Sequence, residues 1–149
     1  MSPKRVTPAQ RQVVFARARG RCEYCHTPDG FVPGSFAVEH IVPRSKGGKT
    51  TLANLALSCP ACNGHKYNKV EGSEPLTSQH VRLFNPRKQR WSEHFTWSND
   101  FTLIIGLTPI GRATIETLRM NQQKMVNLRR LLVLAGLHPY ASQPSYLDC

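Results

Sequence analysis

The sequence predicts a protein of the α+β class with a small strand–loop–strand–helix core. Apolar segments at 36–42 and 55–57 have the length of strands, and a basic, glycine-rich loop separates them. A helical segment at about 60–68 follows directly. Two Cys-x-x-Cys pairs, Cys22–Cys25 and Cys59–Cys62, frame these elements. The spacing of the paired cysteines is typical of a metal site that stabilises a small core.

The segment before the first cysteine pair predicts a helix over about 8–19. Thr7 is a suitable N-cap, and Pro8 suits the first helical turn. Gly20 supplies a C-terminal stop. We therefore expect an N-terminal helix that leads directly into Cys22.

The second half of the chain predicts a connection, a hairpin and helices. Residues 71–90 are polar and rich in turn formers, which indicates a connection. Segments 93–97 and 101–107 flank a Ser-Asn-Asp turn and predict a β-hairpin. Thr108 and the proline after it repeat the helix-start signal, and apolar residues at helical spacing predict a last helix over about 121–134.

The charge of the chain is positive and uneven. The 149 residues include 20 Lys and Arg against 9 Asp and Glu, a net charge of +11. Residues 1–70, the expected N-terminal helix and core, carry 11 basic and 3 acidic residues (+8). Residues 71–149, an extension expected to pack on the core or contact DNA, carry 9 and 6 (+3). Because each neutralised phosphate releases counterions, the excess favours a nucleic-acid partner, mainly for the first part.

The composition argues against membrane and secreted classes. No apolar run approaches the roughly 18 residues of a membrane span. The basic, polar N-terminus lacks the apolar region of a signal peptide. We therefore expect a cytoplasmic protein with neither a membrane partner nor a small-molecule organic cofactor.

The four paired cysteines predict a structural zinc site. Cys22, Cys25, Cys59 and Cys62 supply the four sulfurs of a tetrahedral Zn²⁺ site and leave no position open for catalysis. A disulfide framework is not expected in a chain without a secretion signal. The fifth cysteine, Cys149, stands apart at the last residue.

The residues between the cysteine pairs carry a recognisable pattern. Glu39-His40-Ile-Val-Pro is followed by Ser and Gly-Gly, then by Asn54-Leu, and finally by Cys62-Asn63-Gly-His-Lys66. Over about 21–69 this pattern resembles the HNH endonuclease family, particularly its branch with four zinc-binding cysteines. The resemblance implies a ββα-metal core with structural zinc knuckles, to which this chain adds an N-terminal helix and a C-terminal hairpin and helices.

The resemblance also implies a role for each motif residue. His40 corresponds to the general base, and an imidazole suits that role at neutral pH. Glu39 and Asn63 correspond to ligands of a catalytic divalent metal, Mg²⁺ or Mn²⁺, since carboxylate and amide oxygens are hard ligands. Asn54 corresponds to the residue that orders the loop and thereby orients the histidine.

Two departures from the family pattern affect these assignments. Glu39 stands where the family more often has Asp, which keeps the charge and lengthens the reach. Asn63 stands where many members have His, and His65 is a rival metal ligand two residues later. Positions 63 and 65 are about 200° apart on a helix, so we expect only one to serve. Asn63 is preferred because it directly follows Cys62, as the corresponding residue of the family motif follows its cysteine.

Basic residues cluster in sequence around the expected site. Gly47 and Gly48 allow close approach of the backbone to a phosphate. Lys66 lies one helical turn after Asn63, so we expect it to contact the scissile or an adjacent phosphate. The full set expected to bind nucleic acid is Arg44, Lys46, Lys49, Lys66 and Lys69.

The predicted function is therefore that of a metal-dependent HNH endonuclease, a phosphodiester hydrolase that acts on DNA. Two alternatives stay open: a zinc-dependent DNA-binding module without catalysis, and a nuclease directed at RNA. The target sequence and the oligomeric state are not predicted.

Overall fold

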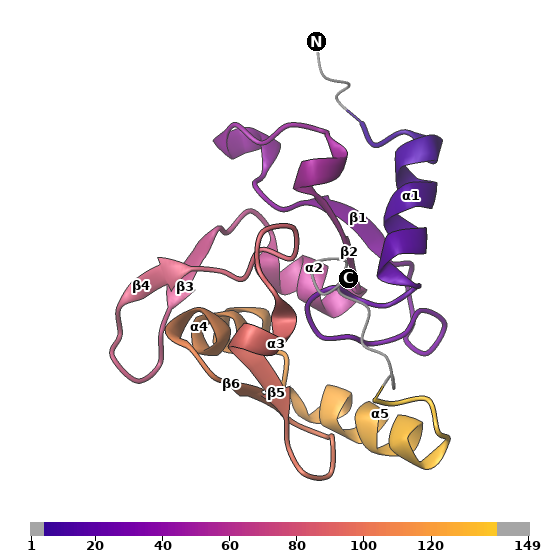
Figure 1. Cartoon of the computed structure of the whole chain (residues 1–149), viewed down its shortest axis with the longest axis vertical. Coiled ribbons are helices and arrows are strands. Elements are labelled where there is room, and N and C mark those ends of the chain that lie inside the picture. The colour runs from indigo at the N-terminus through magenta and orange to yellow at the C-terminus, as the bar shows by residue number, and fades with distance from the viewer. Residues whose placement is uncertain (1–4, 140–149) are drawn as a thin grey trace. The chain divides into compact units, whose positions relative to one another are not determined.

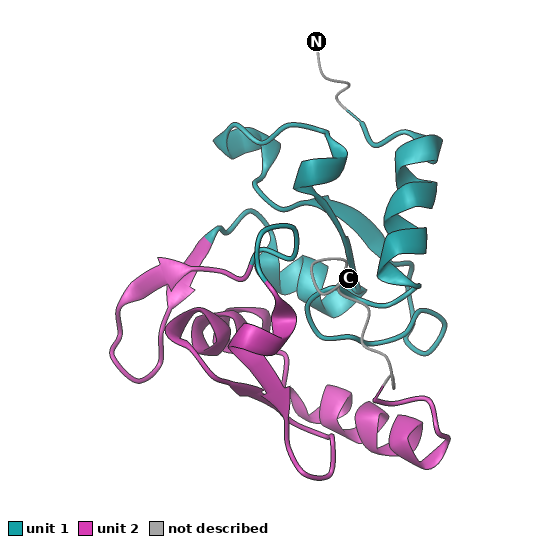
Figure 2. Ribbon diagram, viewed as in Figure 1, with its two compact units in different colours: residues 1–70, 85–89 teal, residues 71–84, 90–149 magenta. Residues whose placement is uncertain are grey.

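The computed structural model of the chain describes residues 5–139. These residues form two compact units (Figure 2). Unit 1 runs to Val70 and includes residues Asn85–Gln89. Unit 2 comprises Glu71–Phe84 and the chain from Arg90 onward. Among residues 5–139, no helix is both long and apolar enough to span a membrane.

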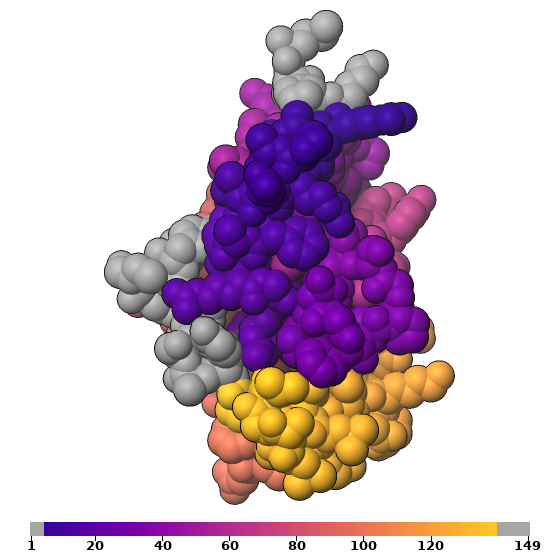
Figure 3. Space-filling model, turned by 90° about the vertical axis from the view of Figure 1, so that its right-hand side faces the viewer, coloured from indigo at the N-terminus to yellow at the C-terminus, as the bar shows by residue number. Residues whose placement is uncertain are grey.

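Unit 1 begins with the helix α1, Pro8–Ala18 (Figure 1). Its N-terminus is closed by a capping box, in which the Thr7 side chain accepts from the Gln10 amide and the Gln10 side chain accepts from the Thr7 amide. The buried residues Val14 and Ala18 face β2, and the outer surface of the N-terminal segment is drawn in indigo in Figure 3. The predicted N-terminal helix is confirmed.

The core of unit 1 is a two-stranded antiparallel sheet followed by a helix. Strand β1, Ala37–His40, pairs with β2, Leu55–Ser58, and places His40 opposite Leu55. Every residue of β2 is buried. Helix α2, Pro60–Lys66, follows and packs against β1, so the expected order of strand, loop, strand and helix is found.

The loop between the strands contains two short 3₁₀ turns, η1 (Arg44–Lys46) and η2 (Leu52–Asn54). Gly48 lies where this loop passes close to the end of β1. A Cβ atom at Gly48 would lie 1.7 Å from the Val42 carbonyl oxygen, so only glycine fits there.

Up to residue 139, where the described part of the chain ends, unit 2 forms two further hairpins and three helices. The α4 helix packs against β6 and against the first hairpin, and Phe84, Phe95 and Leu118 are buried within the unit. The elements are β3 (Glu71–Ser73), β4 (His80–Arg82), α3 (Trp91–His94), β5 (Phe95–Trp97), β6 (Ile104–Gly106), α4 (Pro109–Leu118) and α5 (Gln123–Leu134). The hairpin and the two long helices expected in this half are present.

The prediction of a plain connection over 71–90 was wrong. Strands β3 and β4 pair antiparallel there, with Gly72 opposite Val81. The fully buried Glu74 carboxylate organises the turn between them, because it accepts from both the amide and the hydroxyl of Thr77 at 2.7 Å. Strands of three residues are too short to show the alternation that marks a strand in a sequence.

Candidate active site and zinc site

The four paired cysteines converge inside unit 1. Cys22 and Cys25 follow α1, Cys59 caps α2, and Cys62 lies in its first turn. All four are buried, and their sulfur atoms lie within 4.8 Å of one another, with Cys25 and Cys59 at 3.6 Å. Zn–S bonds of about 2.3 Å in a tetrahedron place the sulfurs about 3.8 Å apart. The cluster therefore has the ligand set and the dimensions of a structural zinc site.

The buried thiols of the cluster shift one another's pKa values. Burial raises the pKa of Cys22 well above its ordinary value. Hydrogen bonds with the other three cysteines hold the pKa of Cys25 well below its ordinary value, and the bond with Cys22 has the largest effect. Four buried thiolates at this spacing would repel one another, and a divalent metal is the group that balances them.

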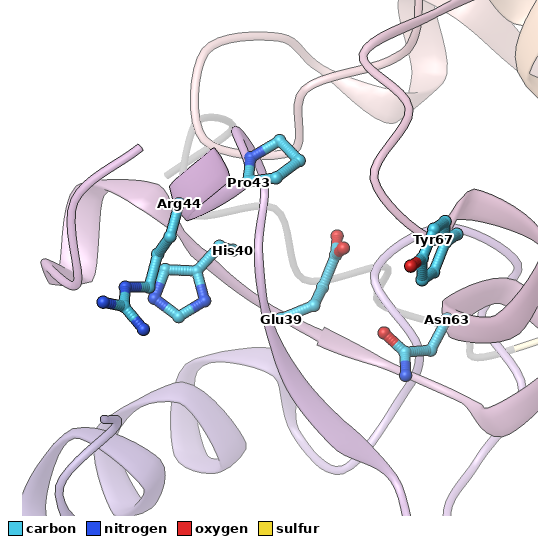
Figure 4. A pocket seen from close by; sticks show the side chains of 6 residues that line it. All are labelled: Glu39, His40, Pro43, Arg44, Asn63 and Tyr67. Carbon is cyan, nitrogen blue, oxygen red and sulfur yellow. The ribbon is translucent and has the colours of Figure 1, made fainter. Parts of the chain in front are cut away.

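An open pocket of about 350 Å³ lies at the end of β1 (Figure 4). In Figure 4, His40 and Arg44 lie side by side, and Glu39 and Asn63 lie on the other side of the strand. The pocket is lined by Glu39, His40, Pro43, Arg44, Asn63 and Tyr67. The structure thus brings together three of the four residues assigned to catalysis, and the fourth, Asn54, shapes the adjoining loop. His65, the rival ligand, is not part of this lining.

Glu39 is held in place by two neighbours. Its side chain is buried, with Oε2 3.1 Å from Nζ of Lys66 and Oε1 accepting a short hydrogen bond from the hydroxyl of Tyr24. Burial raises the pKa of Glu39, and Lys66 and Tyr24 oppose that effect. Each carboxylate oxygen keeps a second lone pair, so these contacts leave room for a further ligand interaction.

Lys66 differs in position from the other basic residues of the expected set. Its side chain is only 2% exposed, and Nζ also donates to the Ile41 carbonyl at 2.8 Å. The sequence interpretation placed this ammonium on a substrate phosphate, whereas the structure places it on Glu39. The reason is that α2 packs against β1, and Lys66 projects from the inner face of the helix. The remaining members of the set are exposed: Arg44, Lys46, Lys49 and Lys69.

His40 is oriented by a residue that the sequence did not single out. Its Nε2 lies 2.8 Å from Oγ1 of Thr50, and the buried Thr50 is itself held through its carbonyl, which accepts from the Gln10 side chain at 3.1 Å. Burial, with help from the cations Arg44 and Lys66, lowers the pKa of His40. The neutral imidazole, the form that can accept a proton, is therefore favoured. The only sequence signal for Thr50 was its place at the end of the basic loop.

Asn54 clamps the loop that follows β1. Its Oδ1 accepts from the Val42 amide at 2.9 Å, and its Nδ2 donates to the carbonyls of Val42 at 3.0 Å and Lys49 at 2.9 Å. The Asn54 carbonyl accepts from the Ile41 amide. A single side chain therefore ties the residues after His40 to the far end of the loop that carries Thr50.

Tyr67 is a pocket residue that the sequence interpretation missed. It lies at the C-terminus of α2, with φ 50° and ψ −113°, and its side chain is 76% exposed. A non-glycine residue in such a sparsely populated region costs about 1–3 kcal/mol. Nothing in the sequence marks a tyrosine that adopts this conformation.

Comparison with known proteins agrees with the site. The family model described as HNH endonuclease matches residues 22–69, which span all four clustered cysteines, β1, β2 and α2. No curated protein and no solved structure matched the chain. The match and the cysteine cluster together bear out the resemblance seen in the sequence. What the chain shares with the HNH endonuclease family is thus the segment over residues 22–69.

Proposed function

We propose that this chain is a metal-dependent endonuclease that hydrolyses phosphodiester bonds of DNA at the pocket formed by Glu39, His40 and Asn63. The observation that carries the proposal is the gathering of these three side chains with Arg44 in one open pocket. The HNH family match over 22–69 supports a nuclease. The net charge of +11 supports a nucleic-acid substrate.

His40 acts as the general base in this proposal. The hydrogen bond with Thr50 fixes its ring, and its lowered pKa favours the neutral form that can take a proton from water. The carbonyl and side-chain contacts of Asn54 hold the loop in which Thr50 lies. Asn54 is therefore a positioning residue and is not expected to touch the reacting atoms.

Glu39 and Asn63 are the residues that would hold the catalytic cation. A carboxylate and an amide oxygen suit Mg²⁺ or Mn²⁺, and both side chains line the same pocket. A bound divalent cation stabilises the negative charge that develops on the phosphate and the leaving oxygen. Lys66 keeps the buried Glu39 carboxylate charge-balanced and in position. Lys66 is therefore not needed as a phosphate ligand.

The exposed basic residues are the proposed contacts to the substrate backbone. Arg44 is the member of this basic set that lines the pocket, so it is the proposed contact to the phosphate undergoing cleavage. Lys46, Lys49 and Lys69 are exposed and would contact flanking phosphates. Cys22, Cys25, Cys59 and Cys62 would hold Zn²⁺ in a structural role, because their four sulfurs would leave no ligand position open for catalysis.

The test is a nicking assay on supercoiled plasmid with Mg²⁺, Mn²⁺ or Ni²⁺ added in turn. We expect the parent to convert supercoiled plasmid to the open or linear form. Binding to DNA without cleavage under all three cations would instead indicate a zinc-dependent binding module. Cleavage of RNA but not DNA would indicate an RNA-directed nuclease.

The two rival metal ligands are separated in the same assay. Asn63→Ala is expected to abolish cleavage, whereas His65→Ala, which changes a residue outside the pocket lining, is expected to retain it. The reverse result would assign the second ligand position to His65.

A further inference from the structure

The backbone of Tyr67 adopts a strained conformation that no packing contact among the described residues offsets. Residues 66–69 form a tight turn, in which the Lys69 amide donates to the Lys66 carbonyl at 2.9 Å. Tyr67 occupies the second position of this turn with φ 50° and ψ −113°. These angles match a type II′ turn, whose second position is taken mainly by glycine, asparagine or aspartate. A tyrosine is a costly choice at this position.

Two other helices of the chain show that a positive φ at a helix end does not by itself require the conformation of Tyr67. Helices α1 and α4 also end at non-glycine residues with positive φ, Arg19 (φ 52°, ψ 38°) and Arg119 (φ 50°, ψ 47°). Both lie in the ordinary left-handed region. Tyr67, with ψ −113°, does not, so the usual helix-ending conformation does not account for it.

Burial of the side chain does not offset the backbone strain at Tyr67 either. The side chain of Tyr67 is 76% exposed, so it buries little apolar surface. Its position in the pocket is the informative property. Figure 4 shows the ring beside Asn63 at the edge of the pocket, across from Glu39. Strained residues that persist without a packing gain concentrate at functional sites.

We propose that Tyr67 is a substrate-positioning residue that stacks on the base of an unpaired nucleotide next to the phosphate held in the pocket. This inference rests on the proposed function, because the pocket must receive a nucleic acid. An exposed aromatic ring beside a site that binds the phosphate backbone can stack on a nucleobase, and such stacking tolerates any base sequence. In a paired duplex the faces of each base are covered by its neighbours. The ring of Tyr67 therefore selects substrates that have a single-stranded nucleotide at the cleavage point.

The experiment measures binding of fluorescent oligonucleotides to the full chain by anisotropy, without added divalent cation, so that cleavage does not interfere. One probe is single-stranded DNA and the other is a fully paired duplex. The variants are Tyr67→Gly, which removes both ring and strain, and Tyr67→Phe, which keeps the ring. Phe31→Gly is the matched control, since Phe31 is an aromatic residue of unit 1 that is 47% exposed and lies outside the pocket lining.

We expect Tyr67→Gly to weaken binding of single-stranded DNA about tenfold, as the loss of one base–aromatic stack does. Binding of the duplex should change much less. Tyr67→Phe should bind within about twofold of the parent, because the ring face is retained. Release of the turn strain should at the same time raise the Tm of Tyr67→Gly by about 3 °C. Weaker binding by a more stable variant excludes misfolding as the cause.

Three results would overturn the proposal. Tyr67→Gly could bind single-stranded DNA as tightly as the parent, or its affinity for single-stranded and for duplex DNA could fall by the same factor. Tyr67→Phe could lose as much affinity as Tyr67→Gly, which would exclude the ring face as the contact. A parent protein that cleaves nothing would instead contradict the nuclease assignment, and the binding comparison would still decide the role of Tyr67.

Discussion

The ammonium group of Lys66 lies 3.1 Å from Oε2 of Glu39, and both side chains are buried. Two charges withdrawn from water are tolerated only when further hydrogen bonds satisfy them. The Ile41 carbonyl does this for the lysine, and the Tyr24 hydroxyl does it for the carboxylate. The pair therefore fixes the side chain that we assign as a metal ligand before any substrate arrives.

Replacing Lys66 by methionine should destabilise unit 1 by about 3–5 kcal/mol, because the buried Glu39 carboxylate loses its partner. Chemical denaturation monitored by circular dichroism measures this loss. Lys69→Met is the control and should change stability by less than about 0.5 kcal/mol, since Lys69 is exposed. The double variant Glu39→Gln/Lys66→Met should recover much of the loss. If Lys66→Met were as stable as Lys69→Met, the structural role of the Glu39–Lys66 pair would be contradicted.

Thr50→Val should lower the cleavage rate about tenfold to a hundredfold, because the His40 ring loses the hydroxyl that orients it. Valine keeps the shape of the buried side chain, so the free energy of unfolding should change by only about 1 kcal/mol. Thr50→Ser restores the hydroxyl and should restore most of the rate. Single-turnover cleavage of a labelled substrate measures all three proteins. Equal rates for the valine and serine variants would show that Thr50 does not act through its hydroxyl.

Cys22→Ser should release the zinc ion and unfold unit 1, since its small core depends on the metal for part of its folding energy. Elemental analysis of the purified protein should give about one zinc per parent chain and much less for the variant. Cys149→Ser is the control, because Cys149 is outside the two Cys-x-x-Cys pairs of the sequence and lies outside the described residues. A metal-free Cys22→Ser protein that stays folded would contradict the assignment.

The ion pair of Glu74 with Arg112 in unit 2 should make stability depend on acid pH. Nε of Arg112 lies 2.5 Å from Oε1 of Glu74, and this contact lowers the pKa of Glu74 from 4.5 to about 2. A lowered folded-state pKa contributes stability above pH 4.5 that is lost as the pH falls toward about 2. The Tm of the parent should therefore exceed that of Glu74→Gln at pH 7, and the difference should shrink between pH 4.5 and 2. A difference that does not change with pH would exclude this linkage.

The sequence predicted the core of unit 1 well because its signals are local. The Thr7 cap marks α1, the two cysteine pairs mark the zinc cluster, and Glu39 and Asn63 keep the spacing of the family motif. Each of these signals depends on residue type and separation along the chain, which a sequence displays directly.

The features that the sequence did not predict depend on packing across the fold. Lys66 could face either solvent or Glu39, and only the contact of α2 with β1 decides between them. Thr50 meets His40 only after the loop is folded back by Asn54. The type II′ geometry at Tyr67 contradicts its residue type, so no propensity rule could have found it.

The most direct test of the account is the rate of Mg²⁺-dependent plasmid nicking by His40→Ala. The account predicts a loss of at least about a hundredfold relative to the parent, the usual contribution of a general base, with unchanged zinc content and circular dichroism. A His40→Ala protein that is folded, holds zinc and nicks plasmid at the parental rate would contradict the assignment of this pocket as the catalytic site.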